Sequence, residues 1–152
     1  MKVYLIGVCG TAMATLAAML VDRGHAVHGS DAHVYPPMSD FLAARGIVCL
    51  DGFDEAHITP DIELVVIGNA VSRGNPEVEA VLDRRLRYRS LPEMVRDEFL
   101  WDRDPIVVAG THGKTTTTAL VSWVLSDCGR DPSFLVGGLV ENFASSYRLG
   151  DG

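Results

Sequence analysis

Cysteine is scarce in this chain of 152 residues, and its three cysteines show no Cys-x-x-Cys spacing. An odd number of cysteines without a secretory signal is typical of a reducing compartment, so we expect a cytoplasmic protein. No apolar run approaches the roughly 18 residues that a membrane-spanning helix needs. The five histidines also lack the spacing of metal ligands. We therefore expect no disulfide framework, no membrane partner and no histidine metal site.

Basic residues are also fewer than acidic residues, 13 lysines and arginines against 20 aspartates and glutamates. The formal net charge is −7, which disfavours a nucleic-acid partner. The one cluster of arginines, at residues 84–89, has no aromatic ladder, and we interpret it as the solvated end of a helix. Hydrophobic residues make up 47% of the chain and charged residues 22%, which is typical of a globular protein with a core.

Apolar runs alternate with helical patterns through the first hundred residues. The runs predict strands, and apolar residues at helical spacing predict helices, with glycine or proline at several boundaries. The predicted strands lie at residues 3–8, 25–29, 47–50, 62–67 and 88–89, and the predicted helices lie at 11–23, 39–44, 91–100 and from Pro76 onward. This alternation predicts an α/β fold, with a parallel sheet covered by helices on both faces.

A glycine-rich loop follows the apolar run at residues 106–109, which we predict to be a strand. The loop reads Gly-Thr-His-Gly-Lys-Thr-Thr-Thr-Thr from Gly110 to Thr118 and leads into an apolar helix. A strand, a glycine turn and a lysine at a helix start form the arrangement that cradles a nucleoside triphosphate. Lys114 is suited to the β- and γ-phosphates and Thr115 to Mg²⁺, so we expect ATP or GTP here.

The spacing of this loop is shorter than the usual Gly-x-x-x-x-Gly-Lys-Ser/Thr, because Val108 stands where the first glycine belongs. The alternative interpretation is an ordinary helix start with a lysine and capping threonines. His112 lies inside the loop. It either contacts phosphate or fills the turn, and the sequence favours neither.

The polar segment 101–105 ends in proline and is typical of a linker. We expect one domain over residues 1–102 and the beginning of a second over residues 103–152. The roughly 50 residues after Asp104 are too few for a complete nucleotide-binding domain, since they supply little more than two strands and a helix. We therefore expect the chain to be the front piece of a longer protein.

A second phosphate-binding pattern lies between the first predicted strand and helix. Gly7 and Ala12 fit the dinucleotide fingerprint Gly-x-Gly-x-x-Gly/Ala, but Cys9 occupies the middle glycine position and Gly10 follows it. Asp31 ends the second predicted strand, where an acid can bind a ribose. The residues alone leave three interpretations open: an NAD site, a site for another nucleotide diphosphate, and a structural turn.

Polar residues follow the predicted strand at 62–67, at the edge where open α/β sheets bind ligands. Asn69 and Ser72 can donate and accept hydrogen bonds there, although an Asx-type turn explains this stretch equally well. Cys9 stands near a helix start, which can acidify a thiol. Because no base is close to Cys9 in the sequence, we expect Cys9 to be a packed small residue rather than a reactive thiol.

The segment from Gly110 to Thr116 resembles the ATP loop of the Mur ligases, which has this shortened spacing. The resemblance covers essentially the whole chain, including residues 7–13, 68–76 and 137–150. It implies a Rossmann-like domain that holds a UDP-sugar, followed by the start of a P-loop ATP-binding α/β domain. Mur ligases join amino acids or peptides to UDP-N-acetylmuramate in peptidoglycan metabolism. They use ATP and Mg²⁺ and pass through an acyl phosphate.

The resemblance also implies roles for individual residues. The implied substrate-binding residues are Gly7, Cys9, Gly10, Thr11, Ala12, Met13, Asp31, Asn69 and Ser72. Those from Gly10 to Met13 would line the diphosphate, and Asp31 and Asn69 would face the nucleoside. The implied ATP-binding residues are Gly110, Thr111, His112, Gly113, Lys114, Thr115 and Thr116. Lys114 and Thr115 would be catalytic, with Thr115 holding Mg²⁺.

Two branches of the family keep histidine at the position of His112. One attaches L-alanine during wall synthesis, and the other attaches the tripeptide L-alanyl-γ-D-glutamyl-meso-diaminopimelate during murein recycling. The Cys-Gly-Thr sequence from Cys9 to Thr11 is more similar to the tripeptide branch, which is our leading prediction, with L-alanine as the close alternative. An NAD-binding oxidoreductase and a non-catalytic nucleotide-binding regulator remain as other classes. We expect the chain alone not to catalyse ligation, because the family's later metal ligands, adenine pocket and third domain are missing from it.

Overall fold

The computed structural model describes residues 1–152, which form two compact units. The first unit comprises Met1–Arg103 and the second Asp104–Gly152. None of the helices has both the length and the apolar character needed to cross a membrane.

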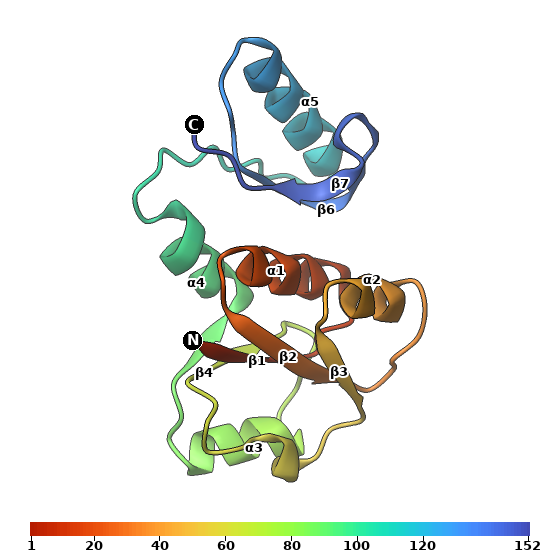
Figure 1. Ribbon diagram of the computed structural model, residues 1–152, viewed down its shortest axis with the longest axis vertical. Helices are drawn as coiled ribbons and strands as arrows, with labels where there is room; N and C mark the ends of the chain where they lie inside the picture. Colours follow the sequence, from red (N-terminus) through yellow and green to blue (C-terminus); the bar gives the residue numbers. More distant parts are fainter. The chain divides into compact units, whose positions relative to one another are not determined.

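The first unit is a five-stranded parallel sheet with helices on both faces (Figure 1). Its strands are β1 (Lys2–Ile6), β2 (Ala26–Asp31), β3 (Val48–Asp51), β4 (Leu64–Ile67) and β5 (Tyr88–Ser90). Its helices are α1 (Thr11–Asp22), α2 (Met38–Ala44), α3 (Pro76–Asp83) and α4 (Leu91–Val95), with a 3₁₀ turn η1 (Glu55–His57) and a π-helical turn η2 (Arg96–Leu100) that continues α4. Helices α1 and α2 cover one face of the sheet and α3 covers the other (Figure 1). The predicted α/β fold is confirmed.

The central strand β1 is buried from Val3 to Ile6 because both faces of the sheet are covered. Val3, Tyr4, Leu5 and Ile6 have no exposed surface, and β2 and β4 flank them in parallel. A continuous apolar run, rather than an alternating one, is typical of such a strand. Gly24 has a φ of 85° and ends α1 where the sequence predicted the stop.

Gly29 of β2 lies directly against Leu5 of β1. A Cβ at this position would collide with the Leu5 carbonyl oxygen. Just beyond, the loop after β1 crosses the end of β2, where the N–H groups of Gly7 and Val8 donate to the Ser30 carbonyl at 2.8 and 3.0 Å. A glycine at 29 thus permits the close strand packing that fixes this loop over the sheet edge.

The strand order β3-β2-β1-β4-β5 creates a switch point. The chain leaves β1 toward β2 on one side, and it leaves β4 toward β5 on the other. The connections after these two neighbouring strands therefore diverge at the carboxyl edge of the sheet. Open α/β sheets bind their ligands in the crevice that this divergence creates.

The second unit contains one helix and a hairpin. Helix α5 (Lys114–Asp127) packs on β6 (Phe134–Val140). The 3₁₀ turn η3 (Glu141–Phe143) joins β6 to its antiparallel partner β7 (Ser145–Arg148). Phe134, Val136 and Val140 form a small core. The sequence predicted α5 and a strand near 134–136, but it did not predict β7.

Residues 106–109 do not form the strand that the sequence predicted. Ile106 and Val107 expose 67% and 79% of their surface. A buried strand needs a neighbour for its backbone N–H and C=O groups, and within residues 104–152 the strands β6 and β7 pair with each other. An apolar run therefore becomes a strand only where a partner strand is available.

Candidate functional site

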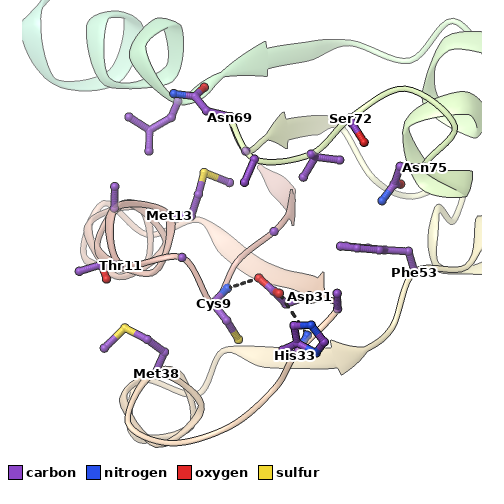
Figure 2. Close-up of a pocket in the computed structure, with 18 of the residues that line it drawn as sticks. Cys9, Thr11, Met13, Asp31, His33, Met38, Phe53, Asn69, Ser72 and Asn75 are labelled. Atoms are coloured by element: carbon purple, nitrogen blue, oxygen red, sulfur yellow. Dashed lines mark hydrogen bonds between the residues drawn. The ribbon is translucent and has the colours of Figure 1, made fainter.

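A cavity of about 1010 Å³ opens at the carboxyl edge of the sheet in the first unit (Figure 2). Its volume is at the upper end of the range for small-molecule sites. Its walls come from the segments that follow β1, β2, β3 and β4. All nine residues proposed from the sequence for substrate binding line it: Gly7, Cys9, Gly10, Thr11, Ala12, Met13, Asp31, Asn69 and Ser72.

Asp31 fixes the loop after β1. Its Oδ2 accepts a hydrogen bond from the Cys9 N–H at 2.9 Å, and its Oδ1 accepts one from the His33 N–H at 3.3 Å (Figure 2). The carboxylate thereby joins the loops that follow β1 and β2. Asp31 thus shapes the cavity wall, a role that the sequence did not predict for it.

Helix α1 brings an uncapped first turn to the cavity. Its N-cap residue is Gly10, and no side chain caps the helix there. The first intrahelical bond runs from the Ala14 N–H to the Gly10 carbonyl at 2.8 Å. Thr11 and Ala12 line the cavity, so their N–H groups and the positive end of the helix dipole are at hand for an anion such as a diphosphate.

The turn after β4 forms the facing wall of the cavity. Backbone hydrogen bonds close it, from the Val71 N–H to the Gly68 carbonyl at 3.0 Å and from the Asn75 N–H to the Ser72 carbonyl at 3.4 Å. The turn therefore does not depend on a bond from the Asn69 side chain. Asn69 and Ser72 are both exposed and both line the cavity.

Other cavity residues were not singled out as site residues from the sequence: His33, Tyr35, Met38, Phe53, Arg73 and Asn75. Phe53 follows β3 just as Asn69 follows β4. The rule that ligands bind beyond the carboxyl ends of parallel strands, applied to every strand, points to Phe53 as well. Arg73 adds a guanidinium group to the wall after β4, where the other polar side chains are Asn69, Ser72 and Asn75.

Cys9 is a partly buried side chain. Burial raises the pKa of its thiol, and a hydrogen bond with Cys49 offsets part of that rise. The two sulfur atoms are 3.5 Å apart. This environment agrees with the interpretation of Cys9 as a packed residue and disagrees with an acidified thiol at a helix start.

The second glycine-rich loop belongs to the second unit and begins α5. Gly110 and Gly113 have φ angles of 149° and 77°, in the region that favours glycine. Gly113 is the N-cap of α5, and no side chain caps the helix. The first intrahelical bond runs from the Thr117 N–H to the Gly113 carbonyl at 2.9 Å. An uncapped helix start behind a glycine turn suits phosphate oxygens.

Lys114 folds back over this loop. Its Nζ donates to the carbonyl oxygens of Gly110 at 2.6 Å and Thr111 at 3.3 Å. The side chains of the loop are exposed, including those of His112 and Thr115. The ammonium group therefore lies beside the same glycine turn and helix start that would receive a phosphate.

The profile described as "Mur ligase family, catalytic domain" matches residues 2–99 of this chain. The chain belongs to the Mur ligase family. The resemblance to the Mur ligases is thereby confirmed.

The chain is similar both to ligases that act on the tripeptide and to ligases that act on L-alanine. An Escherichia coli UDP-N-acetylmuramate–L-alanyl-γ-D-glutamyl-meso-2,6-diaminoheptandioate ligase is 48% identical over 99% of this chain and 33% of its own length. A Methylococcus capsulatus UDP-N-acetylmuramate–L-alanine ligase is 35% identical over 99% of this chain and 31% of its own length. The crystal structure of a murein peptide ligase from Psychrobacter arcticus superposes with a TM-score of 0.91 at 43% identity, over 99% of this chain and 33% of that one. The chain thus spans about a third of the length of these relatives.

Proposed function

We propose that the full-length protein carrying these residues is an ATP-dependent ligase. It joins the tripeptide L-alanyl-γ-D-glutamyl-meso-diaminopimelate to UDP-N-acetylmuramate in peptidoglycan recycling, in the cytoplasm. The observation that carries the proposal is the cavity at the switch point, which is lined by the nine residues named for a UDP-sugar. The higher identity to the tripeptide ligase than to the L-alanine ligase, 48% against 35%, favours the tripeptide as acceptor.

In this proposal the first unit holds the UDP-sugar. The backbone N–H groups at the start of α1, from Thr11 to Met13, bind the diphosphate, because the helix start carries partial positive charge and no side chain occupies it. Asn69 and Asp31 face the nucleoside. Asp31 also keeps the loop in place through its bond to the Cys9 N–H. These residues thus supply binding and orientation.

The second glycine-rich loop is the proposed ATP site. Gly110, Gly113 and the uncapped start of α5 surround the phosphates, and Lys114 stabilises the charge of the transferring phosphoryl group. The Thr115 hydroxyl is the proposed Mg²⁺ ligand. ATP, when bound, would supply the phosphoryl group that activates the muramate carboxylate as an acyl phosphate, with ADP leaving. The amine of the acceptor would then attack the acyl carbon, and phosphate would leave.

The two units correspond, in this proposal, to a UDP-sugar domain over residues 1–102 and the beginning of the ATP domain over residues 103–152. The chain spans a third of the relatives' length. We propose that ligation needs the remainder of the polypeptide and that the 152 residues alone do not turn over.

A ligation assay on the full-length protein tests the proposal. Purified enzyme receives UDP-N-acetylmuramate, MgATP and either the tripeptide or L-alanine, and both phosphate release and the mass of the nucleotide product are measured. We expect a higher kcat/KM for the tripeptide. A preference for L-alanine would assign the enzyme to the other branch, and phosphate release without a nucleotide–peptide product would refute ligation.

The variant Lys114→Ala is the matched control for this assay. It removes the ammonium group from the ATP loop and leaves the cavity of the first unit intact. We expect loss of product formation with unchanged binding of UDP-N-acetylmuramate. Full activity in this variant would contradict the role of the loop.

A further inference from the structure

Two cysteines that are far apart in the sequence meet beside the cavity. Their sulfur atoms, Cys9 Sγ and Cys49 Sγ, are 3.5 Å apart. Cys9 belongs to the loop after β1, and Cys49 lies in β3, opposite Gly29 of β2. The loop crosses the end of β2 to reach this position, held by the bond from the Cys9 N–H to Asp31.

We propose that Cys9 and Cys49 form an oxidisable dithiol, which a peroxide converts to a disulfide that ties the loop of the cavity to β3. A disulfide has a sulfur–sulfur distance of about 2.05 Å, so the two atoms must approach by roughly 1.5 Å. Side-chain rotation and a small shift of the loop supply that movement. Both thiols are partly buried rather than fully buried, and Cys9 lines the cavity, so a small oxidant reaches it.

The surroundings assign different chemical roles to the two sulfurs. Burial, followed by the hydrogen bond with Cys9, raises the pKa of Cys49 to about 12. Burial also raises the pKa of Cys9, but its hydrogen bond with Cys49 acts in the opposite direction. Cys9 is therefore the thiol that more readily forms a thiolate, and Cys49 is the thiol that stays protonated at its side.

The reaction balances with hydrogen peroxide as the oxidant. The Cys9 thiolate attacks one peroxide oxygen, the O–O bond breaks, and a sulfenic acid and hydroxide form. The Cys49 sulfur then attacks the Cys9 sulfur, losing its proton as the S–OH bond breaks, and water leaves. Two thiols and one peroxide thus give one disulfide and two waters. A thiol reductant reverses the change by exchange. Transient disulfides of this kind are compatible with a reducing compartment.

The disulfide acts on the site already described, and this consequence rests on the proposed function. The loop that moves with Cys9 includes Gly10, whose carbonyl accepts the first intrahelical hydrogen bond of α1. A misplacement of about 1 Å in a preorganised site can cost about 100-fold in rate, so small shifts of such a loop matter. We expect oxidation to lower the affinity for UDP-N-acetylmuramate by about tenfold or more, and reduction to restore it.

Peptide mapping of the 152-residue protein tests the disulfide itself. After treatment with hydrogen peroxide and alkylation of free thiols, trypsin separates Cys9 in residues 3–23 from Cys49 in residues 46–73. We expect these two peptides to be cross-linked in the non-reduced digest, with Cys128 still alkylated or oxidised separately. Two alkylated or over-oxidised peptides without a cross-link would overturn the proposal.

The control variants distinguish the pair from the third cysteine. Cys128→Ser removes an exposed thiol and should leave the cross-link unchanged. Cys49→Ser and Cys49→Ala should both abolish it and leave Cys9 as a sulfenic acid that dimedone traps. A cross-link that survives either Cys49 variant, or that requires Cys128, would contradict the assignment.

Binding of UDP-N-acetylmuramate to the reduced and oxidised protein, measured by calorimetry, tests the consequence. We expect weaker binding after oxidation in the wild type and a clearly smaller change in Cys49→Ser, in which the oxidised Cys9 lines the cavity but is not tied to β3. Equal affinity in a protein shown to carry the cross-link would overturn the regulatory role. Absence of binding to the reduced protein would instead contradict the proposed function, and with it this consequence. The disulfide itself is tested by the peptide mapping alone.

Discussion

Glu77 is a carboxylate with no exposed surface, and it connects several segments behind the cavity wall. It accepts hydrogen bonds from the hydroxyls of Tyr4 at 3.0 Å and Ser30 at 2.5 Å and from the Asp54 N–H at 3.4 Å. The His57 Nδ1 atom lies 2.7 Å from it. The segments that contain Tyr4, Ser30 and Asp54 each include a cavity residue close by in the chain. Glu77 therefore supports the cavity wall, although it does not itself line the cavity.

We expect Glu77→Ala to lower the free energy of unfolding by about 3 kcal/mol, because it leaves several buried donors without an acceptor. Glu77→Gln retains one acceptor oxygen, and its amide N–H₂ can donate to a hydroxyl oxygen. We therefore expect this variant to lower the free energy of unfolding by clearly less than Glu77→Ala does. Urea unfolding of the two variants checks this. A loss below about 0.5 kcal/mol in Glu77→Ala would contradict the role of the buried network.

At the residue scale, the sequence predicted the loop residues but not the residues behind them. Gly10 and Gly113 belong to local patterns, in which a glycine turn precedes a helix start, and such patterns can be recognised from a few neighbouring positions. Glu77 acts through Tyr4 and Ser30, which are 73 and 47 positions away. No local pattern encodes that contact, and the pairing of Cys9 with Cys49 depends on the fold in the same way.

At the element scale, the strands and helices of the first unit could be predicted because each has partners within the unit. The strand at 106–109 was predicted on the same kind of apolar run and is absent, since no strand lies beside it. β7 was missed because Ser145–Arg148 is a short polar segment that becomes a strand only by pairing with β6. Apolar pattern alone does not specify which strands have neighbours.

The start of α4 offers a pH-dependent test at this scale. Glu93 accepts hydrogen bonds from the N–H and hydroxyl of Ser90 at 2.7 and 2.8 Å, and these bonds lower the pKa of its carboxyl below the ordinary 4.5. A carboxyl with a lowered pKa in the folded state stabilises the protein above its unfolded pKa. That contribution is lost as the pH falls through the folded pKa.

We therefore expect Glu93→Ala to lower the Tm at pH 7 and to differ less from wild type at pH 3. Glu55→Ala, which removes an exposed glutamate of η1, serves as the matched control and should show a smaller effect at pH 7. Thermal unfolding followed by circular dichroism checks both variants. A Glu93→Ala difference that is the same at the two pH values would contradict the role of the ionised carboxylate.

At the scale of the whole molecule, the chain divides into two units at Arg103 and Asp104. The first unit contains the complete five-stranded sheet and the whole lining of the cavity. The second contains the proposed ATP loop on a helix and a hairpin with a small core. The proposed sugar site therefore has its own structural support in the first unit.

We expect residues 1–103 to fold alone, with a cooperative thermal transition. Their dissociation constant for UDP-N-acetylmuramate should lie within about threefold of that of the 152-residue chain, because no cavity residue is removed. Calorimetric titration of both proteins measures this. A shortened protein that folds but no longer binds, while the longer one does, would contradict the placement of the sugar site.

The central claim is that the cavity of the first unit holds a UDP-sugar and not a nicotinamide dinucleotide. The most direct measurement is an NMR titration of the 152-residue protein with UDP-N-acetylmuramate and, separately, with NAD. We predict that UDP-N-acetylmuramate shifts the amide resonances of Gly10, Thr11 and Ala12 together with that of Asn69, and that NAD leaves them unchanged. Shifts of these amides with NAD and none with UDP-N-acetylmuramate would contradict the account.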